Sequence, residues 1–163
     1  MNNVMAPEAA DWIGRSITYP AYPVTAIDIA KFAYAVGISN PIHLDHDAAV
    51  AAGHPGVVAP LGFHLVIRHA VPNLTPLSEL AADGGGDDLT PPSAARRRMA
   101  GESTTEFLAP IHAGDVITLT KRVADIEEKA GRSGPLAFVG YALQFRNQDD
   151  LTVVNERYVR ILR

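Results

Sequence analysis

The chain has 163 residues, 14 lysines and arginines against 18 aspartates and glutamates, a formal charge of −4, and 47% hydrophobic residues. This length predicts one domain over residues 1–163, because a second hydrophobic core would need roughly another hundred residues. The negative charge argues against a nucleic-acid partner, which requires clustered positive charge to displace counterions from phosphates. No run approaches the ~20 apolar residues of a membrane span, so we expect no membrane partner.

The sequence contains no cysteine, which excludes disulfides, thiolate catalysis and thiolate-ligated metals. The first five residues lack the basic region and the apolar core of a secretion signal, so a cytoplasmic location is expected. The histidines have no spacing that is typical of a metal site: His64 and His69 are five apart, which is not one helix face. We therefore expect neither a metal nor an organic cofactor.

The first elements are predicted to be a strand and a helix. Residues 17–24 have the composition of a strand, and two prolines place it at an edge or a bend, because proline cannot donate to a ladder. Thr25 and Asp28 then predict a helix N-cap and an acidic first turn. Gly37 is a typical helix end. Apolar residues recur between them at the spacing of one buried helix face: Ile29, Phe32, Ala33 and Val36.

Two further helices and a long loop are expected next. A loop over residues 38–45 leads to a short helix over 47–52 that ends at Gly53. The apolar segment 63–71 predicts a helix that is buried on nearly every side. Residues 72–98 are rich in glycine, aspartate and proline, which cannot bury enough surface to offset chain entropy. In a small domain such a segment is expected to be a mobile loop or a lid.

The rest of the chain is predicted to be β-strand, over residues 104–108, 116–127, 136–145 and 153–162. Turn-forming residues between the last three strands predict an antiparallel meander. Because helices come first and strands follow, we predict an α+β fold with helices packed on one face of an antiparallel sheet.

One stretch of nine residues carries a resemblance to a known family: Gly37-Ile38-Ser39-Asn40-Pro41-Ile42-His43-Leu44-Asp45. It resembles the hydratase signature of the MaoC-like dehydratases, Gly-Asp-x-Asn-Pro-[Leu/Ile]-His-x-Asp. The similarity runs in the correct order over about residues 15 to 163, and residues 129–135 resemble the N-terminal dehydratase branch in particular. It implies the hot-dog fold, an antiparallel sheet wrapped around one long helix, here expected at 62–71.

The resemblance also implies a reaction and residues to carry it. Members of the family add water to a 2-enoyl thioester or remove it from the (R)-3-hydroxyacyl form. His43 matches the catalytic histidine, and Asn40 matches the structural asparagine of the loop. Backbone N–H groups at the start of the central helix bind the thioester oxygen in the family, and the matching residues are Leu61 and Gly62.

One position departs from the pattern. Ile38 stands where the family has its catalytic aspartate, and isoleucine cannot accept a proton or a hydrogen bond from water. The neighbouring Ser39 is a poor base at neutral pH. Loss of one of two cooperating groups costs on the order of 10²–10⁴ in rate. The second aspartate of the motif, Asp45, is predicted to be the N-cap of the following helix.

Three functions therefore remain open. The first is a hydratase or dehydratase of an acyl-CoA or acyl-carrier-protein thioester, with His43 as the acid and base. The second is a non-catalytic hot-dog subunit of an active hydratase, which Ile38 would fit. The third is a repurposed enzyme of secondary metabolism that catalyses another elimination or isomerisation. Paired domains are implied in each case, as a homodimer or with another hot-dog chain.

A run of three basic residues is interpreted as solvated surface charge: Arg96, Arg97 and Arg98. The alternative is that these arginines bind the phosphates of coenzyme A.

Overall fold

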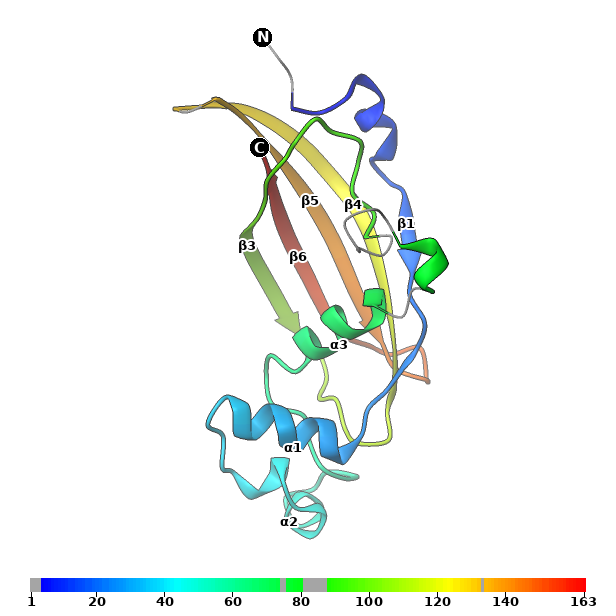
Figure 1. The fold of residues 1–163 in the computed structure, drawn as a ribbon. Coiled ribbons are helices and arrows are strands. Elements are labelled where there is room, and N and C mark those ends of the chain that lie inside the picture. The colour runs from blue at the N-terminus through cyan, green and yellow to red at the C-terminus, as the bar shows by residue number, and fades with distance from the viewer. Residues whose placement is uncertain (1–3, 74–75, 81–87, 133) are drawn as a thin grey trace.

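The computed structural model describes residues 4–73, 76–80, 88–132 and 134–163. Its main feature is a six-stranded antiparallel sheet that curls around a central helix, as Figure 1 shows. The strand order is β1-β4-β5-β6-β3, with β2 paired separately to β4. The strands are β1 (Ser16–Thr18), β2 (Tyr22–Pro23), β3 (Arg98–Phe107), β4 (Val116–Gly131), β5 (Gly134–Arg146) and β6 (Thr152–Leu162). The α+β class and the hot-dog fold are confirmed.

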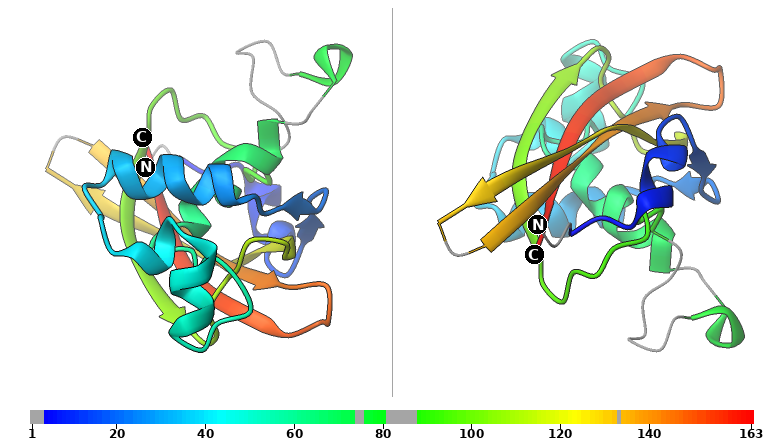
Figure 2. Two further views of the ribbon diagram at one scale, coloured as in Figure 1. Left: turned by 90° about the horizontal axis from the view of Figure 1, so that it is seen from below. Right: turned by 90° about the horizontal axis from the view of Figure 1, so that it is seen from above.

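Of the helices in the described part of the chain, the central one, α3 (His64–Ala70), lies across the inner face of the sheet (Figure 1). The others are α1 (Ala26–Ala35) and α2 (His46–Ala51), with 3₁₀-helices η1 (Pro7–Trp12), η2 (Pro41–His43), η3 (Val71–Asn73) and η4 (Leu77–Glu79). Helices α1 and α2 gather at one end of the strands, whereas the tip of the β4–β5 hairpin projects at the other end (Figure 1, Figure 2). No helix in the described part of the chain is long and apolar enough to cross a membrane.

The meander over β4, β5 and β6 agrees with the sequence prediction, and all three strands are longer than predicted. β3 then pairs with β6 and forms one edge of the sheet. The predicted edge position of the strand over residues 17–24 is confirmed by β1, but the prediction of a single strand is wrong. The chain instead forms two short strands, β1 and β2, which both pair with β4. The break between them contains Pro20, which has no N–H for a ladder.

Helix α1 forms as its capping residues predict. The Thr25 side chain accepts a hydrogen bond from the Asp28 N–H at 3.1 Å, and Ile29 and Ala33 are buried. The Phe32 ring meets the Phe63 ring edge-on, with centroids 5.8 Å apart, and so joins α1 to the core around α3. Val36 is 52% exposed because it lies past the end of the helix, so its predicted place on the buried face is wrong.

The central helix is shorter than the predicted range of 62–71. A turn over residues 60–63 leads into α3, and η3 follows it. Phe63, Ile67 and Val71 are buried against the inner face of the sheet. Leu65 and His69 are exposed, so the helix is not buried on every side, and the opposite face of α3 is uncovered.

The long segment predicted as a loop or lid is partly packed. Leu89 and Pro91 are buried, and β3 already begins at Arg98. The prediction of an unpacked segment over the whole of 72–98 is therefore wrong for its second half, because Leu89 has a place in the hydrophobic core. Residues 74–75 and 81–87 lie outside the described residues, and the prediction of a lid falls partly on them.

Candidate active site

The loop between α1 and α2 is shaped by its own side chains. Gly37 takes a φ of +75° at the end of α1, a conformation that favours glycine. The Asn40 side chain then accepts a hydrogen bond from the Ile42 N–H at 3.3 Å and caps η2. The Asp45 side chain accepts from the Ala48 N–H at 2.8 Å, which confirms its predicted place as the N-cap of α2. These caps set the path of the chain on either side of His43.

The half-buried imidazole of His43 is oriented by one backbone group. Its Nδ1 lies 2.7 Å from the carbonyl oxygen of Val58. Because a carbonyl oxygen only accepts hydrogen bonds, Nδ1 must carry the proton, and Nε2 of the neutral ring holds a lone pair. The ring can therefore accept a proton at Nε2 while its orientation stays fixed.

Val58 itself is held in a short strap, residues 57–59, that is bonded on both sides. On one side the Val58 N–H donates to the Ile42 carbonyl at 3.0 Å. On the other side the Ala59 N–H donates to the Ile111 carbonyl at 2.8 Å, and the Ala113 N–H donates to the Val57 carbonyl at 2.9 Å. The position of His43 thus depends on a strap that residues far along the chain hold in place.

The turn that follows the strap presents backbone N–H groups. In the described part of the chain, neither the Leu61 nor the Gly62 N–H donates a hydrogen bond. Gly62 has a φ of +95°, and a Cβ on it would lie 3.5 Å from the Phe32 ring. Leu61 is 74% exposed. These two N–H groups are available to bind an oxygen atom beside the start of α3.

Ile38, half-buried, is fixed to the end of α1 by its N–H, which donates to the Ala33 carbonyl at 2.8 Å. Among the described residues, no carboxylate forms a hydrogen bond or an ion pair with His43. The described residues therefore give the His43 ring one hydrogen-bonded partner, the carbonyl of Val58. We find no group of three or more histidines, aspartates or glutamates within the described ranges that is placed to hold a metal.

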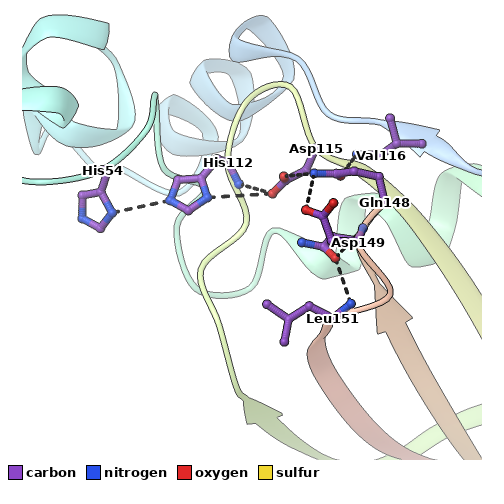
Figure 3. A network of polar contacts seen from close by, with 8 residues as sticks. His54, His112, Asp115, Val116, Gln148, Asp149 and Leu151 are labelled. Atoms are coloured by element: carbon purple, nitrogen blue, oxygen red, sulfur yellow. Dashed lines mark hydrogen bonds and ion pairs between the residues drawn. The ribbon is translucent and has the colours of Figure 1, made fainter.

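A polar network lies behind the strap, and nothing in the sequence indicated it (Figure 3). His112 forms an isolated bridge with Val58, and its Nε2 lies 3.5 Å from Nδ1 of His54. The His112 N–H donates to the Asp115 carboxylate at 2.7 Å, and the Gln148 amide donates to the same carboxylate at 3.3 Å. The network joins the end of α2 to the β5–β6 hairpin. Burial lowers the pKa of His112, and the neighbouring His54 lowers it further against the opposing effect of Asp115.

The fold defines the class of protein, a hot-dog domain, and the loop that carries His43 resembles the dehydratase signature. A family model described as "FAS1-like, dehydratase domain region" matches residues 11–156. The chain belongs to this family, and the resemblance to the MaoC-like dehydratases is confirmed.

Two curated relatives show the similarity in sequence. A UPF0336 protein of Clavibacter michiganensis is 36% identical over 112 residues, which cover 69% of this chain and 68% of that protein. A probable enoyl-CoA hydratase alpha subunit of Thermomonospora curvata is 30% identical over 167 residues, which cover 93% of this chain and 49% of that protein. The chain thus spans about half of the second relative.

Two solved structures show the similarity in fold. A MaoC-like dehydratase superposes with a TM-score of 0.74 at 22% identity, over 94% of this chain and 43% of that one. The HadBC (3R-hydroxyacyl-ACP dehydratase) complex of Mycobacterium tuberculosis superposes with a TM-score of 0.70 at 20% identity, over 93% of this chain and 97% of that one. At these identities the likeness concerns the fold alone.

Proposed function

We propose that this protein is a hydratase or dehydratase of acyl thioesters, which interconverts a 2-enoyl thioester and its (R)-3-hydroxyacyl form. The observation that carries the proposal is the hydrogen bond from His43 Nδ1 to the Val58 carbonyl at 2.7 Å, which leaves Nε2 as a proton acceptor. The name of the probable enoyl-CoA hydratase alpha subunit, which is similar in sequence, supports the same reaction.

In the hydration direction, His43 Nε2 takes a proton from water as the water oxygen attacks C3 of the enoyl group. Electron density moves to the thioester oxygen, which the Leu61 and Gly62 N–H groups stabilise as it gains charge. The enolate then collapses and C2 takes a proton, for which protonated His43 is the source. The ring returns to its neutral form, and atoms and charge balance.

Two further residues belong to this proposed site. Ile38 occupies the position at which the family motif has its aspartate. It would therefore place an apolar side chain beside the thioester, and His43 alone would bind the attacking water. Asn40 uses its side-chain oxygen on the Ile42 N–H, and its amide nitrogen remains for the substrate. Ile38 also supports the third hypothesis, a different elimination or isomerisation in a drier pocket. A cytoplasmic location is part of the proposal.

A second function, that of a non-catalytic subunit beside an active hot-dog chain, is favoured by a specific surface. Within the described ranges the edge strand β3 pairs with β6 alone, so its outer edge offers unpaired backbone groups. Apolar side chains are exposed beside it and on the uncovered face of α3: Leu61, Leu65, Phe107 and Leu108. Such a surface fits a second hot-dog chain, and HadBC and the alpha subunit are named as parts of assemblies.

The test follows crotonyl-coenzyme A by the loss of its enoyl absorbance. Wild-type protein is compared with His43→Ala, with Ile38→Asp, and with His46→Ala as the control, since His46 is an exposed histidine on the adjacent helix. Turnover that disappears in His43→Ala alone supports the enzyme. Turnover that appears only in Ile38→Asp, or only with a second hot-dog chain, supports the subunit. If no combination gives turnover, the hydration proposal is wrong.

A further inference from the structure

A partly open pocket on the inner face of the sheet is lined by charged side chains. It has a volume of about 210 Å³ and lies between the end of α3 and the inner face of β4, β5 and β6. We call it the inner chamber. Its polar lining includes Arg68, Lys121, Arg160, Asp88, Tyr19 and Tyr158. A hydrocarbon chain in this space would desolvate several charges without giving them a partner, which is costly.

Two arginines are held on the chamber wall with donors to spare. The guanidinium of Arg68 lies 4.7 Å from the Tyr158 ring centroid, and that of Arg160 lies 6.0 Å from the same ring. Among the described residues, Arg68 donates one hydrogen bond, to Glu156, whereas Arg160 donates to Asp88 and Thr90 through Nη1 and also bonds the Tyr158 side chain. A guanidinium has five N–H donors, so each arginine retains capacity for a further acceptor.

Next to Arg68, which lines the chamber, three buried polar atoms of His64 and Glu156 lack hydrogen-bond partners among the described residues. His64 is 4% exposed and Glu156 is 3% exposed. His64 Nε2 lies 3.8 Å from Glu156 Oε2, beyond hydrogen-bond distance, and within the described residues neither of these atoms, nor His64 Nδ1, has a hydrogen-bond partner. Burial lowers the pKa of His64, so the ring is neutral near pH 7. Polar groups buried in this way favour a polar ligand or water over hydrocarbon.

We propose that the inner chamber binds a carboxylate at the far end of the acyl group, so that the substrate class is a thioester of a dicarboxylic acid. This inference rests on the function proposed above. A carboxylate matches the planar fork of a guanidinium, and Arg68 and Arg160 both face the space. Asp88, which also lines it, disfavours a doubly charged phosphate.

The geometry of α3 sets the length of such a substrate. The Leu61–Gly62 turn precedes α3, and Arg68 lies four residues after His64, a helical rise of ~6 Å that the turn itself extends by a few ångströms. In Figure 1 the helix starts at the end nearer to α1 and runs across the inner face of the sheet. A thioester oxygen at the turn and a carboxylate at Arg68 are therefore separated by about the span of an eight-carbon chain.

The experiment compares two pantetheine thioesters, because pantetheine is common to coenzyme A and carrier proteins. One carries octanoate and the other carries suberate, so the chains match in length and differ in the terminal carboxylate. Binding to wild-type protein is measured by calorimetry at pH 7.5. We expect the suberyl thioester to bind at least about tenfold more tightly, the effect of one charge-assisted contact.

Variants assign the preference to the chamber. Arg68→Met removes the donor to the substrate carboxylate. The double variant Arg68→Met with Glu156→Gln removes the same donor and also neutralises Glu156, so that no buried carboxylate is left without its partner. We expect at least one of the two variants to remain folded. Both should lose the preference for suberyl while binding octanoyl thioester within about threefold of wild type. Arg157→Met is the control, because Arg157 is a half-exposed arginine of β6 paired with Asp125 on the other face.

The outcomes separate the two proposals. Equal binding of both thioesters by wild-type protein overturns the dicarboxylate inference and leaves the proposed function standing. Binding of neither thioester overturns both. If Arg157→Met abolishes the preference for the suberyl thioester as fully as Arg68→Met does, the preference reflects the overall charge of the protein. That outcome overturns the assignment of the preference to the chamber.

Discussion

His43 and Val58 are joined by a hydrogen bond of 2.7 Å between the ring Nδ1 and the backbone carbonyl. The same Val58 donates its N–H to the Ile42 carbonyl, so the loop and the strap are bonded twice at this point. The strap leads directly into the turn that carries the Leu61 and Gly62 N–H groups. A proton acceptor and two hydrogen-bond donors are thus carried by neighbouring segments with little freedom to shift relative to each other.

The first prediction concerns the backbone of this turn. Gly62→Ala forces a Cβ onto a residue with a φ of +95° and places it 3.5 Å from the Phe32 ring. We expect a loss of about 1–3 kcal/mol of unfolding free energy and a fall in turnover of ~100-fold, because the two N–H groups move. Chemical denaturation and initial rates measure the two effects.

Gly53→Ala is the matched control for that change. Gly53 has a φ of +91° at the end of α2, with nothing within 4 Å of its Cβ position. It should lose similar stability and keep its turnover. If both variants lose turnover alike, the effect is one of strain, and the Leu61–Gly62 turn has no special part in the reaction.

A second prediction concerns pH. Burial lowers the pKa of His64 and of His112 in the folded protein. The unfolded chain, with histidine pKa values near ~6.5, then binds more protons than the folded chain below that pH. The contribution of the neutral, buried histidines to the free energy of unfolding is therefore fully present above pH ~6.5 and is lost as the pH falls below it. Urea unfolding between pH 7.5 and 5.5 should show a declining free energy of unfolding.

The part of His112 in this decline can be isolated. His112→Gln keeps a polar side chain in the network but removes one titrating group, so its stability should fall less steeply toward pH 5.5. His46→Gln, at an exposed histidine, should follow the wild-type curve. A free energy of unfolding that stays level or rises toward acid pH would contradict the argument from burial.

The third prediction concerns the core beneath α3. Ile67 is fully buried, so Ile67→Ala should cost about 2–5 kcal/mol in the free energy of unfolding, from lost burial and a residual cavity. Leu77→Ala should cost less than about 0.5 kcal/mol, since Leu77 is 89% exposed. Denaturant titrations compare the two variants, and equal costs would mean that α3 does not pack as described.

A fourth prediction concerns the edge of the sheet. Leu65 and Leu108 are exposed on α3 and after β3, on the surface that we assign to a second hot-dog chain. Leu65→Glu or Leu108→Glu should weaken association, because a charge would be buried at the contact. Sedimentation of the protein, alone and with a hot-dog partner, measures this. Leu77→Glu is the control, and equal effects of all three changes would exclude this surface.

The sequence predicts those structural features that depend on residues close together in the chain. The Thr25 and Asp45 caps and the three strands of the meander follow from patterns within a few residues, and the structure agrees. The break between β1 and β2 does not follow from composition, because residues 17–24 favour a strand more strongly than Pro20 opposes one. The burial of Leu89 was missed because the surrounding residues are those of a loop.

Contacts between distant residues could not be predicted. His43 meets Val58 across 15 positions, His112 meets His54 across 58, and Arg68 meets Glu156 across 88. Each depends on how the sheet and helices pack, and no local pattern encodes it. The inner chamber arises in the same way, from residues of α3, β4, β6 and the segment before β3.

The most direct measurement of the central claim is the fate of labelled water. Crotonyl-pantetheine is incubated with the protein in water enriched in oxygen-18, and the product is analysed by mass spectrometry. We predict a 3-hydroxybutyryl product with one labelled oxygen from the wild-type protein and none from His43→Ala. Equal labelling by both proteins, or none from the wild type with or without a second hot-dog chain, would contradict the role assigned to His43.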